Sequence, residues 1–249
     1  MKLNVLSDLH LDFYNEFKAY EIIDETMNEV DCDYHVIAGD LCEMSNINYF
    51  KYINKLEELS SPVIYVFGNH EYYNVTNAKR EIFLNVINRY NNIKVLNNNS
   101  CKIDNKIFYG GTMWFDESPE SIKSSEVYPQ VYALSDFNHI HVDFNYYMEE
   151  NKKFFDNIKD INPEIIVTHH VPHKDMLLIN YNRDMYDMNK FYYCDKAFQY
   201  IEENRPKLWI CGHTHKTNDM MCGNTRIINN SFGYPNENVN VFNNKIVEI

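Results

Sequence analysis

The sequence VIYVFGNHE (residues 63–71) joins a short apolar run to an abrupt polar end. β-Branched and aromatic residues dominate the run, which predicts a buried strand, and Gly68 permits a tight turn directly after it. Two earlier apolar runs, 3–6 and 34–38, end in polar residues in the same way. Helical patterns over about 20–30 and 47–59 separate these runs, so the sequence predicts parallel βαβ units. In such sheets, ligands bind beyond the carboxyl ends of the strands.

The rest of the chain continues this alternation. Strand patterns at 165–168 and 207–211 again end in polar residues. A hairpin is predicted over 101–109, where Asp104-Asn105 suits a two-residue turn, and antiparallel strands are predicted at 226–229 and 239–248. Further helices are predicted over about 76–90, 144–159 and 193–203.

A loop-rich insertion is expected over 114–141. This stretch has weak periodicity, mixed charge and two prolines, Pro119 and Pro129. Such a segment suits a lid or a substrate-shaping loop over a rigid scaffold. With 249 residues and no internal repeat, we expect the whole chain, 1–249, to form one domain.

The composition excludes several classes of partner. Acidic residues outnumber basic ones by 36 to 23, which gives a formal charge of −13 and argues against broad capture of nucleic acid or an anionic membrane. The first residues lack the apolar core of a secretory signal, and no apolar run reaches transmembrane length. The six cysteines are scattered without a CxxC pair, which favours reduced thiols and a cytoplasmic location. The oligomeric state stays open.

The polar strand ends together supply the side chains of a metal centre. Residues two apart on an extended backbone point the same way, so Asp8 with His10, and His213 with His215, can each present two ligands to one place. Asp40 adds a carboxylate able to bridge two cations, Asn69 adds an amide oxygen and His169 adds an imidazole. A glycine directly precedes Asp40, Asn69 and His213, which permits tight turns and close backbone approach. These seven ligands suffice for two metal sites.

In this order, the strand-end blocks resemble those of the calcineurin-like metallophosphoesterase superfamily, and of its compact bacterial and phage members. The blocks are Asp8-Leu9-His10, Gly39-Asp40, Gly68-Asn69-His70-Glu71, His169-His170-Val171-Pro172 and Gly212-His213-Thr214-His215. The resemblance implies an α/β or α+β fold, a four-layer αββα sandwich in which helices flank two mixed β-sheets.

The resemblance also implies a dinuclear site. One metal would take Asp8, His10, Asp40 and His215, and the other would take Asp40, Asn69, His169 and His213, with His70 in a catalytic role. The family's His-x-Pro pattern favours His169 as the ligand, but the doubled histidine leaves His170 open as a replacement or an assistant. Nitrogen and oxygen ligands without thiolate suit two divalent or mixed-valence Mn, Fe, Zn, Co or Ni ions, among which ligand type does not distinguish.

Other histidines and cysteines have simpler interpretations. His139 and His141 form a His-x-His pair without a strand-end glycine or a partner carboxylate, so a non-metal role is favoured, and the same holds for His35. Cys42 and Cys211 lie close to the ligand blocks in sequence but are expected to belong to the core.

The predicted activity is hydrolysis of a phosphomonoester or phosphodiester by a hydroxide that bridges the two metals. Two dications outweigh Asp8, Asp40 and the hydroxide, so the centre attracts a phosphate although the chain is acidic, which favours a small or accessible ester. A catalytically silent scaffold for protein partners is an alternative, but every ligand is present here. A nuclease of the same superfamily would need a basic groove that no Lys/Arg cluster indicates, and a protein phosphatase also stays open.

Overall fold

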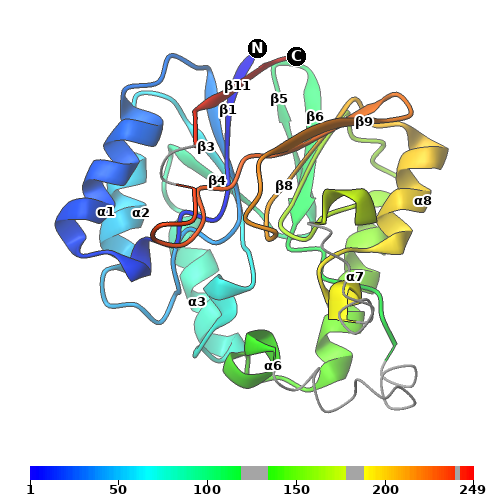
Figure 1. Cartoon of the computed structure of the whole chain (residues 1–249), viewed down its shortest axis with the longest axis horizontal. Helices are drawn as coiled ribbons and strands as arrows, with labels where there is room; N and C mark the ends of the chain where they lie inside the picture. The colour runs from blue at the N-terminus through cyan, green and yellow to red at the C-terminus, as the bar shows by residue number, and fades with distance from the viewer. Residues whose placement is uncertain (119–133, 178–187, 239–241) are drawn as a thin grey trace.

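The computed structural model describes residues 1–118, 134–177, 188–238 and 242–249. Across these residues the strands form two sheets, a five-stranded one in the order β11-β1-β2-β3-β4 and a six-stranded one in the order β5-β6-β7-β8-β10-β9 (Figure 1). The first sheet contains β1 (Lys2–Leu6), β2 (Tyr34–Ala38), β3 (Val63–Val66), β4 (Ile93–Leu96) and β11 (Lys245–Glu248). The second contains β5 (Asn99–Ile103), β6 (Lys106–Gly111), β7 (Ile165–Thr168), β8 (Leu208–Cys211), β9 (Asn218–Cys222) and β10 (Thr225–Asn229).

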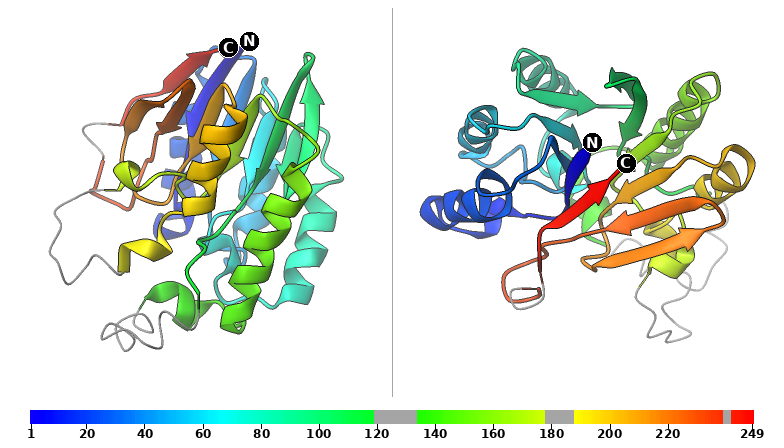
Figure 2. Two further views of the ribbon diagram at one scale, coloured as in Figure 1. Left: turned by 90° about the vertical axis from the view of Figure 1, so that its right-hand side faces the viewer. Right: turned by 90° about the horizontal axis from the view of Figure 1, so that it is seen from above.

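Both sheets are mixed, with parallel strands at their centres. Strands β1 to β4 run parallel, whereas β11 runs antiparallel to β1 at the edge. In the second sheet β6, β7, β8 and β10 are parallel, and β5 and β9 are antiparallel edge strands. The carboxyl ends of the parallel strands all lie away from the two chain termini, which sit side by side (Figure 2).

Helices cover the outer face of each sheet. The first sheet carries α1 (Glu16–Ile23), α2 (Tyr49–Glu57) and α3 (Asn77–Ile87), and the second carries α7 (Phe144–Ile158) and α8 (Asp195–Asn204) (Figures 1 and 2). The short α6 (Ser135–His139) lies near the carboxyl ends of the strands. The expected four-layer αββα sandwich is therefore confirmed.

The strand sequences explain the layers, because alternate residues face opposite sides of a sheet. In β3, Ile64 and Val66 pack between the two sheets, whereas Val63 and Tyr65 pack under the helices. In β8, Leu208 and Ile210 join the same core between the sheets, whereas Trp209 and Cys211 face α7 and α8. Each central strand is thus buried on both faces, which is why it has a continuous apolar sequence.

Local signals explain where several elements begin and turn. Asn15, Thr76 and Asp143 cap α1, α3 and α7, since the side chain of each accepts a hydrogen bond from a backbone N–H of the first turn. Asp104 and Asn105 both have left-handed backbone angles, with φ of 47° and 65°, as the two-residue turn of the β5–β6 hairpin requires.

The predicted elements agree with the structure except at the sheet edges and in one helix. β4 and β9 were not predicted, because each is short, Lys94 interrupts the apolar run of β4, and β9 begins with the polar Asn218 and Asp219. The strands predicted at 226–229 and 239–248 exist as β10 and β11, but they belong to different sheets and pair antiparallel with β9 and β1. The helix expected over 20–30 begins earlier, at Glu16, and continues as a π-helix over Asp24–Asn28.

Part of the predicted insertion, 119–133, lies outside the described residues, as do residues 239–241 of the last predicted strand. The described part of the insertion contains α6. Across the described helices, none combines the length and apolar character needed to cross a bilayer.

Candidate metal centre

The turns after β1, β2 and β8 have an unusual backbone conformation. Asp8, His10, Asp40, His213 and His215 all have left-handed angles, with φ of 55°, 44°, 55°, 70° and 52°. For residues with a Cβ this conformation costs roughly 1–2 kcal/mol each, and such strain concentrates at functional sites. The sequence carries no sign of it, since none of these residues is glycine.

The first candidate group contains Asp8, His10, Asp40 and His215, whose ligand atoms all lie within 4.8 Å of one another. The Nε2 atoms of His10 and His215 are 2.9 Å apart. Asp40 Oδ2 lies 3.7 Å from the Nε2 of His10, and Asp8 Oδ1 lies 3.7 Å from that of His215. These residues were predicted to act together, and the structure brings them together.

The second candidate group contains Asp40, His169 and His213. Asp40 Oδ2, the same oxygen that faces His10, lies 3.3 Å from His169 Nε2. Asn69 Oδ1 lies 2.8 Å from His169 Nε2 and 3.1 Å from His213 Nδ1. Asp40 therefore belongs to both groups, as expected of a bridging carboxylate.

The donor set fits cations. His169 Nδ1 donates to the carbonyl of Ala38 at 2.9 Å, and His215 Nδ1 donates to Glu237 at 2.7 Å. Because both partners can only accept, the Nε2 atom of each ring is left free to coordinate a cation held beside the carboxylates. The Nε2 atoms of His10 and His215 lie 2.9 Å apart, and Asn69 Oδ1 lies beside His169 Nε2 and His213 Nδ1. Converging acceptors of this kind are what a metal ion satisfies.

The electrostatics also favour positive charge at this point. Burial alone would lower the pKa of His169, but Asp40 beside it raises that pKa to about 10. Burial opposes ionisation of Asp40 as well, yet the neighbouring histidines, His169 first, hold its pKa well below the usual range. Burial lowers the pKa of His10 and His213 well below the usual value, so these rings stay neutral and free to act as ligands.

Glycines allow the ligands to pack this closely. A Cβ on Gly39, whose φ is 88°, would overlap the ring of His169, and a Cβ on Gly68 would overlap the carboxylate of Asp40. Gly39 directly precedes Asp40, and Gly68 directly precedes Asn69. Both positions need glycine because the neighbouring side chains approach the backbone too closely for a Cβ atom.

Four residues to which the sequence patterns assign no role hold the candidate ligands in place. Asp136 on α6 accepts hydrogen bonds from Asn69 Nδ2 at 2.7 Å and from Tyr73 at 2.6 Å, which turns Asn69 Oδ1 toward the histidines. Ser231 donates to Asp8 Oδ2 at 2.5 Å, and Glu237 orients His215. The fourth is Glu71, which alone among them stands within one of the strand-end blocks.

Glu71 links two of the ligand turns, which are the turns at the strand ends that carry the candidate metal ligands. Its carboxylate accepts from the backbone N–H groups of Asp40 at 3.1 Å, Leu41 at 2.7 Å and Gly68 at 2.6 Å, and from the hydroxyl of Tyr65 at 2.6 Å. Burial and the charge of Asp40 raise the pKa of Glu71 to about 7. The fourth residue of the Gly-Asn-His-Glu block thus links the turns after β2 and β3.

His70 lies beside the ligand groups and is buried. Its backbone N–H donates to Asp40 Oδ1 at 2.9 Å, and its ring centroid lies 4.5 Å from that of His10. The hydroxyl of Tyr234 lies 3.0 Å from His70 Nε2. Carboxylate oxygens of Asp12 and Glu43 also approach the ring, within 4.8 Å. His70 is thus positioned at the centre without belonging to either ligand group.

The other histidines lie outside both groups. His170 is buried and stacks on His213 at a centroid distance of 4.3 Å, so His169, rather than His170, is the one that faces Asp40. His139 stacks on Tyr73, and His35 contacts Asn4 inside the first sheet. Among the described residues, neither His139, His141 nor His35 enters a metal-ligand group. Cys42 and Cys211 are buried in the core clusters.

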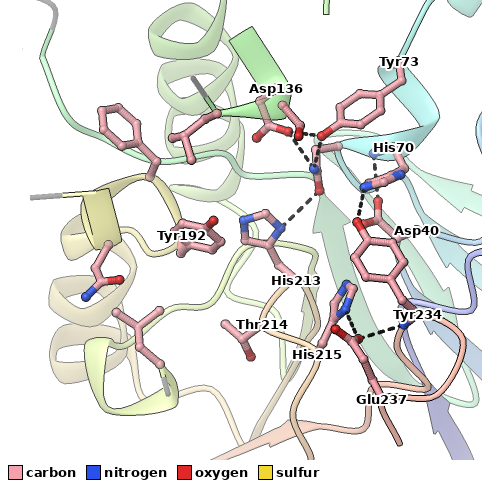
Figure 3. A pocket seen from close by; sticks show the side chains of 16 residues that line it. Asp40, His70, Tyr73, Asp136, Tyr192, His213, Thr214, His215, Tyr234 and Glu237 are labelled. Atoms are coloured by element: carbon pink, nitrogen blue, oxygen red, sulfur yellow. Dashed lines mark hydrogen bonds and ion pairs between the residues drawn. The ribbon is translucent and has the colours of Figure 1, made fainter. Parts of the chain in front are cut away.

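A cavity of about 440 Å³ opens onto the ligand groups (Figure 3). Its lining includes the polar side chains of Asp40, Asn69, His70, Asp136, His213, His215 and Tyr234. Apolar and aromatic side chains also line it, namely Leu134, Leu177, Phe191 and Tyr192. A small ligand can therefore reach the centre beside an apolar surface.

Comparisons with known proteins identify the family. A family model described as calcineurin-like phosphoesterase matches residues 1–217. This chain belongs to the calcineurin-like phosphoesterase family. Membership implies a phosphoester hydrolase and divalent metal ions, in agreement with the candidate groups at the strand ends. The resemblance found in the sequence blocks is therefore confirmed.

Individual relatives are distant. The chain is 27% identical to the uncharacterized protein L509 of Acanthamoeba polyphaga mimivirus, over 96% of this chain and 93% of that protein. Its fold is similar to phosphopantetheinyl hydrolase of Mycobacterium tuberculosis, with a TM-score of 0.74 and 14% identity over 94% of this chain and 90% of that one. It is also similar to TT1561 of Thermus thermophilus, with a TM-score of 0.59 and 15% identity over 92% and 88% of the two chains. At such identities the solved structures establish the fold alone.

Proposed function

We propose that this protein is a dinuclear metal-dependent phosphoesterase. The observation that carries the proposal is the position of Asp40 Oδ2, which faces His10 at 3.7 Å in one ligand group and His169 at 3.3 Å in the other. One carboxylate oxygen between two sets of histidines is the arrangement expected of a bridge between two cations.

The assignment of ligands follows the two groups. Asp8, His10, Asp40 and His215 would hold one cation, and Asp40, Asn69, His169 and His213 would hold the other. Bound there, two divalent cations would lower the pKa of a water and neutralise charge on the phosphoryl oxygens. Imidazole and carboxylate ligands without thiolate suit Mn, Fe, Zn, Co or Ni.

His70 is the proposed general acid. Its buried ring lines the cavity beside Asp40, and its backbone N–H fixes its place through Asp40 Oδ1. A proton delivered from this ring to the leaving oxygen lets the P–O bond break without releasing a bare alkoxide. Neutral Asn69, which precedes it, adds a ligand without adding negative charge.

The cavity favours a small or accessible ester. A volume of about 440 Å³ suits a ligand of drug or nucleotide size, and the apolar wall provides a surface for an uncharged leaving group. The formal charge of −13 opposes binding of a long polyanion. Both phosphomonoesters and phosphodiesters are compatible with this geometry.

The test is hydrolysis of bis-(p-nitrophenyl) phosphate and p-nitrophenyl phosphate by the purified protein with added Mn²⁺. We expect turnover by the wild type and a loss of at least about 10³-fold in Asp40→Ala, because that change removes a ligand from both groups. Asp160→Asn, an exposed carboxylate outside the centre, is the matched control. Equal rates from the wild type and Asp40→Ala would refute the proposal, as would binding of a protein partner without turnover across a broad panel of phosphoesters.

A further inference from the structure

A C-terminal loop beyond the part matched by the family model closes one side of the centre. The match ends at residue 217, whereas this loop, Ser231 to Asn238, follows β10. Its backbone is anchored on the first ligand turn, since Phe232 N donates to the Ser7 carbonyl and Gly233 N donates to the Asp8 carbonyl, both at 2.9 Å. The loop is therefore built against the ligands.

Two side chains of this loop contact histidines of the centre (Figure 3). Glu237 accepts from His215 Nδ1 at 2.7 Å and from the backbone N–H of Tyr234 at 2.8 Å. The hydroxyl of Tyr234 lies 3.0 Å from His70 Nε2. The phenol ring is fixed in turn, with its centroid 4.4 Å from that of His10 and 4.9 Å from that of Phe13.

Tyr234 is the one polar side chain found within hydrogen-bond distance of the His70 ring in the described part of the chain. The other ring nitrogen, Nδ1, is buried and has no partner there. Both His70 and Tyr234 line the cavity, so their hydrogen bond faces the space that is open to a substrate.

We propose that Tyr234 is the positioning residue for His70, an inference that rests on the phosphoesterase activity proposed above. A hydroxyl can accept and donate. Before proton transfer its oxygen accepts the Nε2–H of His70, which keeps that proton on the cavity side. After transfer, the same hydroxyl donates to the bare Nε2 and stabilises the neutral ring.

The proposed step balances in atoms and charge. The oxygen of water forms the new bond to phosphorus, and the P–O bond to the leaving group breaks with its electron pair. The leaving oxygen takes the proton from His70 Nε2, and the proton lost by the water restores the ring. Tyr234 loses and gains nothing overall, so its effect is on the orientation and tautomer of His70.

This role makes a distinctive prediction about the leaving group. A p-nitrophenolate leaves as a stable anion and needs little help from an acid, whereas a phenolate without the nitro group needs a proton. Removing a residue that orients the acid should therefore slow hydrolysis of phenyl esters and spare p-nitrophenyl esters. A change that merely loosened the site would slow both.

The experiment compares Tyr234→Phe, His70→Ala, the double variant and the wild type, each loaded with Mn²⁺, on matched phenyl and p-nitrophenyl phosphoesters. For Tyr234→Phe we expect kcat on the phenyl ester to fall about tenfold, the scale of one hydrogen bond to a charged group. KM, bound Mn²⁺ and kcat on the p-nitrophenyl ester should stay within about twofold of wild type. Because both residues act in one step, the double variant should be no slower than His70→Ala alone.

Tyr14→Phe is the control, since Tyr14 packs on Phe232 of the same loop but lies outside the centre. Equal losses on both esters, lower Mn²⁺ content in Tyr234→Phe, or additive losses in the double variant would overturn the inference and make Tyr234 a packing residue. Turnover of neither ester by the wild type would instead refute the phosphoesterase proposal, and the role of Tyr234 would be refuted with it.

Discussion

The ligand turns and the segments that support them differ in how they reach the centre. The proposed ligands follow β1, β2, β3, β7 and β8 directly, so the sheets themselves bring them to one edge. Their supports come from elsewhere: Asp136 from α6 of the insertion, and Ser231, Tyr234 and Glu237 from the loop after β10. The sheets thus determine which side chains meet, whereas peripheral segments determine how they are oriented.

Among residues of the centre outside both ligand groups, the largest effect is expected from His70→Ala. Removing the proposed acid should lower turnover of phenyl phosphoesters by about 10²- to 10⁴-fold, the usual contribution of acid–base catalysis, while leaving both ligand groups complete. Activity on phenyl phosphoesters and metal content by elemental analysis would be measured on the same preparation. A variant that lost its metal would place His70 among the structural residues of the ligand turns instead.

The ligand turns could be predicted from the sequence because their signals are local. An apolar strand, a glycine and a polar residue stand within a few positions of one another, and parallel strands place such ends together. Asp8, His10, Asp40, Asn69, His169, His213 and His215 were all predicted as ligands, and the structure brings all of them together.

The supporting residues could not be predicted, because each acts on a partner far away in sequence. Asp136 stands in a loop-rich stretch, 67 residues from Asn69, and Glu237 stands in an Asn-rich segment 22 residues after His215. No periodicity links such pairs. The edge strands β4 and β9 were missed because each has only four or five residues, too few for a pattern to be distinct.

A smaller effect should come from the supports themselves. Asp136→Ala removes the carboxylate oxygen that accepts both hydrogen bonds, so Asn69 Oδ1 is no longer held toward His169 and His213. We expect the affinity for the Mn²⁺ of the second group to fall about 10- to 100-fold, as is typical when the partner of a metal ligand is lost. Isothermal titration calorimetry, which resolves two binding steps, would measure it.

Glu237→Ala is the matched variant for the other group, because it removes the hydrogen bond that orients His215. Its effect should be confined to the first group and be smaller, since the Glu237 side chain is 45% exposed whereas Asp136 is buried. Equal weakening of both Mn²⁺ binding steps by both variants would contradict this prediction. Asp136 and Glu237 would then act through the general stability of the fold, and not by orienting individual ligands.

The smallest effect on the centre is expected from His35, a buried histidine that belongs neither to the ligand turns nor to the segments that support them. It lies on β2 with Asn4 Nδ2 3.1 Å from its Nδ1, and burial lowers its pKa to about 4. The unfolded chain takes up a proton near pH 6.5, but the folded chain does so only near pH 4, so the free energy of unfolding should fall as the pH drops through this window.

The contribution of His35 is at most about 3 kcal/mol, from about 1.4 kcal/mol per pH unit. Urea unfolding of the metal-free wild type and His35→Gln between pH 4 and pH 7 would isolate it, because the ligand histidines titrate in both proteins and cancel in the difference. The stability advantage of the wild type should be greatest above pH 6.5 and shrink toward pH 4, with Mn²⁺ affinity at pH 7 unchanged. A pH-independent difference would mean that the pKa of His35 is the same in the folded and the unfolded chain, and weakened metal binding would connect the sheet interior to the ligand turns.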